Sequence, residues 1–212
     1  MIGFQMNKII KYLDKIIPNP KCELNYSKDY ELLIAIVLSA QTTDRRVNKV
    51  TEILFKEYPT LNDLADASLE RLEEIIREIG TYHKKALFIK EIAIKLVRDN
   101  IKILLNDREY LESLPGVGRK TVNVFLGEVY NEGVIAVDTH VSRVSKRLNL
   151  CGEEDNVLTI EKKLDDLVPS SKRASFHKQM VLFGRYHCKA VKPLCSSCEL
   201  KNICKYYKEN NS

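Results

Sequence analysis

Seven residues near the middle of this sequence, Leu114 to Lys120, leave the chain few structural options. They read Leu-Pro-Gly-Val-Gly-Arg-Lys and lead directly into a helical run. Gly116 and Gly118 can adopt φ > 0 and let the main chain approach another backbone closely, and Pro115 presets φ for a turn. The N-terminus of the following helix offers free N–H groups and the positive end of the helix dipole to an anion. The segment therefore indicates a turn between two helices that binds a phosphate group.

Lys120 falls in the first turn of the helix predicted after Gly118. Most lysines beside phosphates act as point charges, and lysine at a helix start is common. A lysine amine held close to a sugar can also act as a nucleophile and form a Schiff base. The local sequence leaves both roles open for Lys120.

Helical periodicity dominates the chain, and no convincing pair of strands is present. Good N-cap residue types precede several of the helical runs, and glycine or proline follows several others. We therefore predict an all-α protein in which helices pack on helices. The predicted helices cover 5–17, 29–39, 44–57, 68–78, 84–99, 107–113, 119–130, 139–148, 156–167 and 172–186, with predicted N-caps Asp29, Thr43, Ser68, Asp138 and Ser171, and predicted stop signals Gly80, Gly127 or Gly133, and Pro169.

Length and composition are those of a globular protein without a membrane span. The 212 residues suffice for one large or two small domains, and 44% of them are hydrophobic. The apolar run 31–40 is far too short to cross a bilayer, and residues 1–17 lack the features of a secretory signal. We expect no membrane partner and a cytoplasmic protein, associated with the nucleoid of a bacterium or archaeon.

Positive charge is concentrated near the C-terminal end. The net charge of the chain is +5, yet residues 171–208 contain nine lysines and arginines and a single acid, Glu199. A solvated basic face would explain this excess, but a docking surface for a polyanion agrees better with the phosphate-binding turn.

The same segment contains four cysteines, Cys188, Cys195, Cys198 and Cys204, in a C-x6-C-x2-C-x5-C pattern. Cysteines so close together in an intracellular chain indicate a metal site rather than disulfides. Zinc sites usually consist of two separated C-x-x-C knuckles, whereas short-spaced runs of four cysteines suit an iron–sulfur cluster. Cys22 and Cys151 are isolated and are interpreted as ordinary thiols.

Asp138 follows the apolar run Ile135-Ala136-Val137 and precedes a helical run. It suits an N-cap of that helix. A carboxylate held rigidly by a cap can also take a proton or stabilise a cationic sugar in a transition state. Neither role excludes the other, and we assign no chemical role to neighbouring His140.

Taken together and in this order, the motifs L-P-G-V-G-R-K-T, V-D-T-H and G-R-Y-x-C with the four cysteines resemble the endonuclease III family of helix-hairpin-helix DNA glycosylases. Residues 23–26 (Glu-Leu-Asn-Tyr) and 38–44 (Leu-Ser-Ala-Gln-Thr-Thr-Asp) also match, so the resemblance covers about residues 5–207. It implies two helical domains with a DNA-binding cleft between them. A six-helix domain, 22–132, would carry the hairpin, and 1–21 with 133–212 would form the other domain and hold a [4Fe–4S] cluster on the four cysteines.

The resemblance also implies the chemistry. Lys120 would attack C1′ of a damaged nucleotide and displace its base, and the resulting Schiff base would permit β-elimination and strand cleavage 3′ to the lesion. Asp138 would assist. The substrates would be oxidised pyrimidines and abasic sites in double-stranded DNA, bound by a monomer. Gln41 would fill the gap left by the flipped nucleotide, and the other expected DNA contacts are Ile79, Leu114, Gly116, Gly118, Arg119, Lys189 and Lys192.

The sequence departs from the family at Thr81, where a bulky apolar wedge is common; Ile79 or Tyr82 could compensate. Lesion and opposite-base preference therefore stay open. Three other interpretations also stay open: a monofunctional mismatch glycosylase, a non-catalytic DNA-binding module, and a zinc-ribbon adaptor. Monofunctional relatives typically lack lysine at the position of Lys120, which makes this residue the discriminating one.

Overall fold

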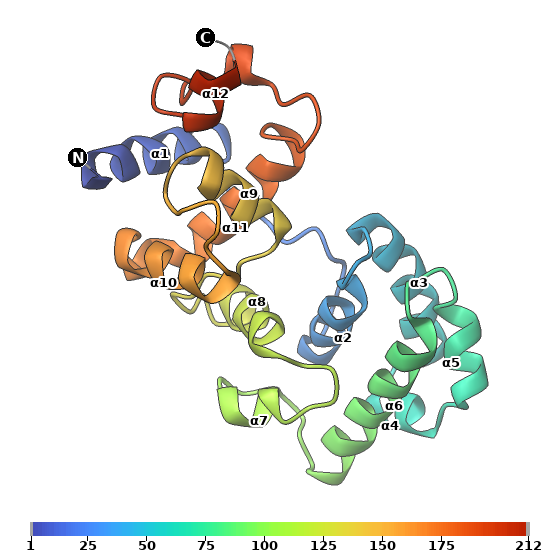
Figure 1. Cartoon of the computed structure of the whole chain (residues 1–212). Helices are drawn as coiled ribbons and strands as arrows, with labels where there is room; N and C mark the ends of the chain where they lie inside the picture. Colours follow the sequence, from blue (N-terminus) through green and yellow to red (C-terminus); the bar gives the residue numbers. More distant parts are fainter. Residues whose placement is uncertain (1, 211–212) are drawn as a thin grey trace. The chain divides into compact units, whose positions relative to one another are not determined.

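The structure, a computed structural model, describes residues 2–210, and these residues form helices and no strand. The all-α class predicted from the periodicity is thereby confirmed. The elements, shown in Figure 1, are α1 (Ile2–Ile16), α2 (Asp29–Ser39), α3 (Asp44–Glu57), α4 (Leu61–Asp66), α5 (Leu69–Ile75), α6 (Tyr82–Arg98), α7 (Arg108–Glu112), α8 (Arg119–Val129), α9 (Thr139–Arg147), α10 (Val157–Leu167), α11 (Ser170–Tyr186), the 3-10 turn η1 (Cys195–Ser197) and α12 (Lys205–Asn210).

The chain divides into two compact helical units. The segment Cys22–Tyr130 forms one unit and contains α2 to α8. The other unit combines α1 with the segment from Asn131 onward, which contains α9 to α12. The sequence-based boundaries place residues 131 and 132 in the continuous unit instead.

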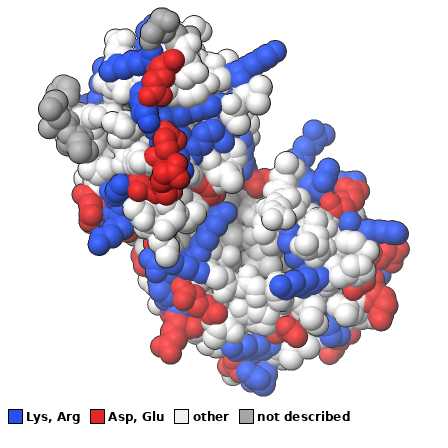
Figure 2. All heavy atoms as spheres, viewed as in Figure 1, with Lys and Arg blue, Asp and Glu red and all other residues white. Residues whose placement is uncertain are grey.

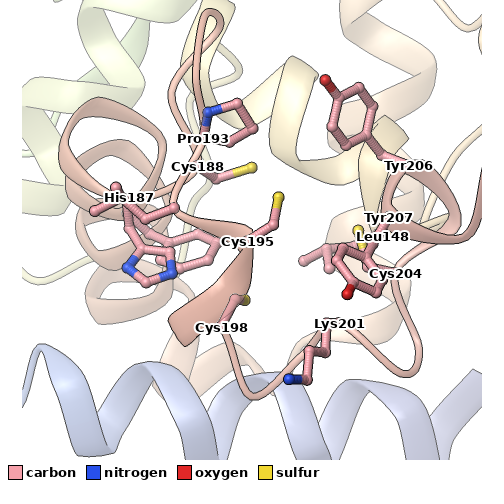
Figure 3. A pocket seen from close by; sticks show the side chains of 12 residues that line it. Leu148, His187, Cys188, Pro193, Cys195, Cys198, Lys201, Cys204, Tyr206 and Tyr207 are labelled. Atoms are coloured by element: carbon pink, nitrogen blue, oxygen red, sulfur yellow. The ribbon is translucent and has the colours of Figure 1, made fainter. Parts of the chain in front are cut away.

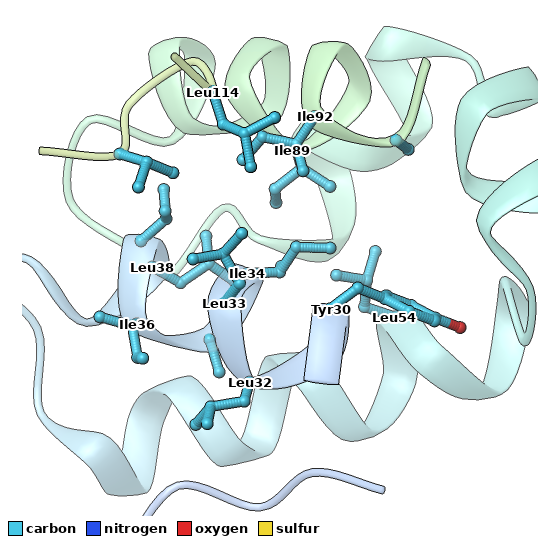
Figure 4. Close-up of a cluster of buried hydrophobic side chains, with 14 of the residues drawn as sticks. Tyr30, Leu32, Leu33, Ile34, Ile36, Leu38, Leu54, Ile89, Ile92 and Leu114 are labelled. Carbon is cyan, nitrogen blue, oxygen red and sulfur yellow. The ribbon is translucent and has the colours of Figure 1, made fainter. Parts of the chain in front are cut away.

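Helix α2 is the centre of the unit Cys22–Tyr130. Nine of its eleven residues, Tyr30 to Leu38, are buried, so the helix has no face for solvent. A helix that is apolar all round must be covered on every side. Helices α3, α6 and α8 supply that cover, and Figure 4 shows side chains of α2 beside Leu54, Ile89, Ile92 and Leu114 of the same core.

Helices α7 and α8 enclose the two-glycine turn. Asp107 caps α7 through a hydrogen bond from the Tyr110 N–H to Oδ1, 3.0 Å long. Within the turn, the side chains of Leu114 and Val117 are buried, and the Val117 N–H donates to the Leu114 carbonyl at 3.1 Å. The turn is therefore anchored by its apolar residues, while Gly116 and Gly118 lie at the surface.

Helix α6 supports this hairpin from within the same unit. Gly116 has φ +73°, and a Cβ added there would lie 2.4 Å from a ring carbon of Phe88. Lys95 donates from Nζ to the carbonyl and the hydroxyl of Ser113, at 3.0 and 2.7 Å, where α7 ends. Glycine at position 116 is thus required both by its conformation and by the close approach of the turn to α6.

The second unit is organised around α11, which packs against α1 and α9. Its core contains Leu13 of α1, Val144 of α9, and Met180 and Phe183 of α11. A Cβ added at Gly184 would lie 2.9 Å from Cβ of His140, so this glycine permits the close approach of α11 to α9. The position of α9, which begins next to Asp138, depends on that contact.

The helix boundaries differ from the prediction at several N-caps. The structure confirms Thr43, Ser68 and Asp138 as N-cap residues. In contrast, α2 begins with Asp29 after the N-cap Lys28. Pro169 directly follows the C-cap of α10, as predicted for a stop signal, and is also the N-cap of α11. The prediction of Asp29 and Ser171 as caps was wrong by one and two residues.

Two helices were not predicted, α4 and α12, and each has only six residues. A pattern with a period of 3.6 residues does not show over so few positions. The available signal for α4 was a capping box, in which Thr60 and Asp63 exchange hydrogen bonds of 3.0 and 3.2 Å.

Gly127 is not a stop signal, because it lies buried inside α8. No helix in the described part of the chain is long and apolar enough to cross a membrane.

The contact between Gly116 and Phe88 yields a first prediction. Gly116→Ala should lower the free energy of unfolding by about 2–5 kcal/mol, because it adds left-handed strain of roughly 1–2 kcal/mol to overpacking of roughly 1–3 kcal/mol. Gly118→Ala is the matched control, since its φ is −108° and nothing lies within 4 Å of an added Cβ. Urea denaturation of both variants measures the difference, and equal losses would contradict the account.

Candidate active site and cysteine pocket

Lys120 is the second residue of α8 and its side chain is exposed. The N-cap of α8 is Gly118, so no side chain caps the first N–H groups of the helix. Among residues 2–210, no hydrogen bond or ion pair involves the Lys120 amine. An unpaired amine at an uncapped, positive helix end can approach an anionic strand and react with it.

The other predicted residues of the hairpin divide into two groups. Gly116, Gly118 and Arg119 are exposed. Leu114 is only 2% exposed, and its side chain belongs to the core of the unit. Any contact of Leu114 with a ligand must therefore come from its backbone.

Gln41 and Ile79 follow α2 and α5, respectively, in the same unit. Gln41 is exposed and has a left-handed backbone, with φ +58°. Ile79 is 1% exposed and packs in the core. The expectation that Ile79 supplies an apolar wedge in place of Thr81 was therefore wrong for its side chain, and half-buried Tyr82 is the remaining candidate.

Asp138 is held rigidly at the start of α9 in the other unit. Its Oδ1 accepts a hydrogen bond of 2.7 Å from the Val141 N–H, which is the cap predicted from the sequence. The side chain is half-buried, and Oδ2 has no hydrogen-bond partner among the described residues. The cap fixes the carboxyl group and leaves one oxygen for chemistry.

Two arginines of α9, Arg143 and Arg147, were not singled out in the sequence. Arg143 donates from Nη2 to the Gly184 carbonyl at 2.7 Å and lies 3.2 Å from Nδ1 of His140. Burial lowers the pKa of His140. Both arginines also donate to the Cys188 carbonyl, at 3.3 and 3.4 Å. The helix that begins next to Asp138 is thus bonded to the start of the cysteine segment.

The four predicted cysteines line one pocket, which Figure 3 shows with their sulfur atoms directed into a common space. Leu148, Phe183 and Tyr206 contribute apolar walls. Burial is the largest cause of the raised pKa values of Cys195, Cys198 and Cys204, and the neighbouring Cys188 raises each of them further. These mutual effects reflect four thiols gathered from a 17-residue segment.

Arg147 adds a positive group to this pocket. Its Nη1 lies 3.4 Å from Sγ of Cys188 and donates to the Lys189 carbonyl at 2.7 Å, and its Nη2 donates to the Ala190 carbonyl at 3.1 Å. The guanidinium group stacks on the Tyr206 ring, 4.0 Å from the ring centre. A cation placed in this way favours thiolates over thiols.

The basic residues near the C-terminal end are partly neutralised by acids from elsewhere in their unit. Lys172, Arg173 and Lys205 form ion pairs with Asp14, Asp165 and Glu153. Lys189 and Lys192, in contrast, are exposed, and their amines have no ion-pair partner in the part of the chain that the structure describes. Figure 2 shows basic and acidic side chains interspersed on the visible face, so attraction to a polyanion depends on such unpaired lysines.

The chain is similar in sequence to known DNA repair proteins over most of its length. Residues 34–170 match the family model described as the HhH-GPD superfamily base excision DNA repair protein. The chain is 44% identical to endonuclease III of Bacillus subtilis (strain 168) over 196 residues, 91% of this chain and 90% of the relative. It is 43% identical to endonuclease III of Buchnera aphidicola subsp. Acyrthosiphon pisum (strain APS), over 94% of both chains.

The chain belongs to the endonuclease III family. It is a bifunctional base excision repair enzyme, a DNA glycosylase and AP lyase, and DNA is its partner.

Solved structures of other proteins have the same fold. A structure described as a trapped endonuclease III–DNA covalent intermediate, an estranged-adenine complex, superposes with a TM-score of 0.93 at 44% identity and covers 98% of this chain and 97% of that chain. A thermostable thymine-DNA glycosylase superposes with a TM-score of 0.84 at 22% identity, over 97% of both chains. At that identity the second likeness shows a common fold alone.

The Asp138 cap yields a second prediction. Asp138→Ala should lower the free energy of unfolding by about 0.5–2 kcal/mol, because the Val141 N–H loses its acceptor. Asp138→Asn keeps an acceptor oxygen and should change stability by only a few tenths of a kcal/mol, roughly within the noise of surface substitutions. Urea denaturation distinguishes the two, and an equal loss in both variants would show that the charge, not the cap, stabilises α9.

Proposed function

We propose that this enzyme removes oxidised pyrimidines from duplex DNA and cleaves the strand 3′ to the resulting abasic site, with Lys120 as its nucleophile. The observation that carries the proposal is the exposed, unpaired amine of Lys120 at the uncapped N-terminus of α8. That amine can approach the sugar of a nucleotide whose phosphate is bound by the hairpin backbone.

In this mechanism the neutral Lys120 amine attacks C1′ of the damaged nucleotide. The bond from C1′ to the base breaks, and the base leaves with that electron pair and a proton. The sugar ring then opens to give an imine between Nζ and C1′. Loss of a proton from C2′ expels the 3′ phosphate by β-elimination, and hydrolysis of the imine releases Lys120.

Asp138 is proposed as the carboxylate that assists this reaction. Its capped Oδ1 fixes the group, and Oδ2 is available to take a proton or to stabilise positive charge on the sugar. Because the cap alone would account for an aspartate here, its catalytic role must be tested separately from its structural one.

The proposed DNA contacts follow the exposure of each residue. Gly116, Gly118 and Arg119 contact the phosphate at the hairpin, and Lys189 and Lys192 contact phosphates from the cysteine segment. Gln41 fills the space of the flipped nucleotide, since a long polar side chain can bond to the orphaned partner base. Ile79 and Leu114 contribute through their backbones, because their side chains are buried.

The sequence alone also left a monofunctional glycosylase open, and the endonuclease III relatives disfavour that interpretation. Two observations favour a lyase. Lysine occupies position 120, and the relative of known structure at 44% identity is described as trapped in a covalent complex with DNA. We further propose that the enzyme acts as a monomer in the cytoplasm of a bacterium or archaeon, associated with the nucleoid. The two relatives named above are bacterial.

We also propose that Cys188, Cys195, Cys198 and Cys204 hold a [4Fe–4S] cluster. In residues 2–210, no three Cys, His, Asp or Glu side chains are gathered as a single metal ion requires. Four sulfurs bound to one zinc lie within about 4 Å of one another, because each Zn–S bond is about 2.3 Å. The four sulfurs instead lie around a shared pocket. That arrangement suits a [4Fe–4S] cluster, in which each iron binds one thiolate. The cluster would hold the segment that carries Lys189 and Lys192 in place.

The nucleophile yields a third prediction. On a duplex with one thymine glycol, Lys120→Gln should lose strand cleavage by at least about a hundredfold, and Asp138→Asn should slow base removal by about a hundredfold or more. Arg119→Gln is the neighbouring control and should weaken binding while keeping cleavage. Base removal without cleavage by the unaltered enzyme would assign it to the monofunctional group.

The cysteine pocket yields a fourth prediction. The purified protein should be yellow-brown and contain iron and inorganic sulfide in equal amounts, whereas zinc would leave it colourless. Cys198→Ser should lose iron and thermal stability, because metal binding and folding are coupled. The control is Cys151→Ser, at a buried cysteine outside the pocket, which should keep its iron. Stoichiometric zinc without iron would contradict the proposal.

A further inference from the structure

Lys85 is a buried lysine to which the mechanism above gives no role. It lies in the first turn of α6, and only 5% of its surface is exposed. No carboxylate pairs with it in the described part of the chain, and burial lowers its pKa. A buried cation without a counter-charge is costly, so its hydrogen bonds must compensate.

The Lys85 amine donates two hydrogen bonds to backbone carbonyls at the C-terminal end of α2. Nζ donates to the Leu38 carbonyl at 3.0 Å and to the Ala40 carbonyl at 2.6 Å. Carbonyl groups at a helix C-terminus have no partner within the helix and carry the negative end of its dipole. The last turn of α2 contains no basic residue of its own. Lys85 therefore supplies the missing cation from a different helix.

Lys85 also contacts a second turn through its backbone. Its N–H donates to the Thr81 carbonyl at 3.1 Å. Thr81 and Gln41 both have left-handed backbones, with φ +56° and +58°, although neither is a glycine. Such a conformation is strained for an ordinary residue and persists only where surrounding contacts impose it. Lys85 bonds to Thr81 and to the residue directly before Gln41.

We propose that Lys85 is a positioning residue for nucleotide flipping, which fixes the exposed Gln41 turn relative to the Gly80–Thr81 turn. Residues 79–85 and 38–42 thereby form one rigid element built from two loops and a buried cation. The inference rests on the proposed function, because it assigns Lys85 an effect that is transmitted through Gln41. Loss of both amine bonds leaves the Ala40 carbonyl with only the long bond from the Thr42 hydroxyl, 3.4 Å, and lets Gln41 leave its strained conformation.

The test uses Lys85→Met, which keeps an unbranched side chain one atom shorter than lysine and removes both hydrogen bonds. Lys90→Met is the matched control, because Lys90 lies on the same helix and its amine bonds to the Ala67 carbonyl, at the C-cap of α4. Single-turnover excision from a duplex with one thymine glycol should fall about tenfold for Lys85→Met, a loss of orientation rather than of a reacting group. Lys90→Met should excise at the rate of the unaltered enzyme.

A double-mutant cycle with Gln41→Ala separates positioning from general loss of stability. If Lys85 acts through Gln41, Lys85→Met should cost little further activity in the Gln41→Ala background. Additive effects of the two substitutions, or an equal loss in Lys90→Met, would overturn the inference. If Lys85→Met does not fold, as judged by circular dichroism, Lys85→Gln takes its place in the same cycle.

Excision by the unaltered enzyme distinguishes a failure of the inference from a failure of the proposed function. An unaltered enzyme that excises thymine glycol, together with a fully active Lys85→Met variant, overturns the role of Lys85 alone. An unaltered enzyme that neither excises thymine glycol nor cleaves an abasic-site duplex contradicts the proposed function, and the inference about Lys85 falls with it.

Discussion

The complete burial of α2 is the constraint on which the unit Cys22–Tyr130 depends. A helix without a polar face must be covered on every side, and α3, α6 and α8 all pack against it. The start of α8, with Lys120, and the end of α2, before Gln41, are therefore parts of one packing arrangement. Helix α6 contacts both, with Phe88 against Gly116 in the turn before α8 and Lys85 bonded to the Ala40 carbonyl after α2.

In the second unit, one short helix, α9, makes several of the contacts that position the site. Helix α9 begins at the Asp138 cap, packs on α11 at Gly184, and bonds through Arg143 and Arg147 to the backbone around Cys188. A rigid carboxylate and the cysteine segment are thus attached to the same short helix. Substitutions in α9 should therefore influence the carboxylate and the segment with Lys189 together, because α9 bonds to both.

The sequence was sufficient to predict the elements that carry their own local signals. The two-glycine turn, the Asp138 cap and the four cysteines each follow from residue type and spacing. The sequence was insufficient where contacts with residues distant along the chain decide whether a side chain is buried. The family resemblance implied that Ile79 and Leu114 contact DNA, yet their side chains are in the core. Lys85 has the appearance of one helix lysine among several, and only the position of α2 shows that it is buried between two strained turns.

Borohydride trapping followed by peptide mapping tests the central claim, that Lys120 is the nucleophile, most directly. Reduction of the enzyme on a duplex with an abasic site should give a covalent protein–DNA species, and proteolysis should place the reduced sugar on Nζ of Lys120. Lys120→Gln should give no such species. An adduct on a different residue, or base removal without any adduct, would contradict the claim.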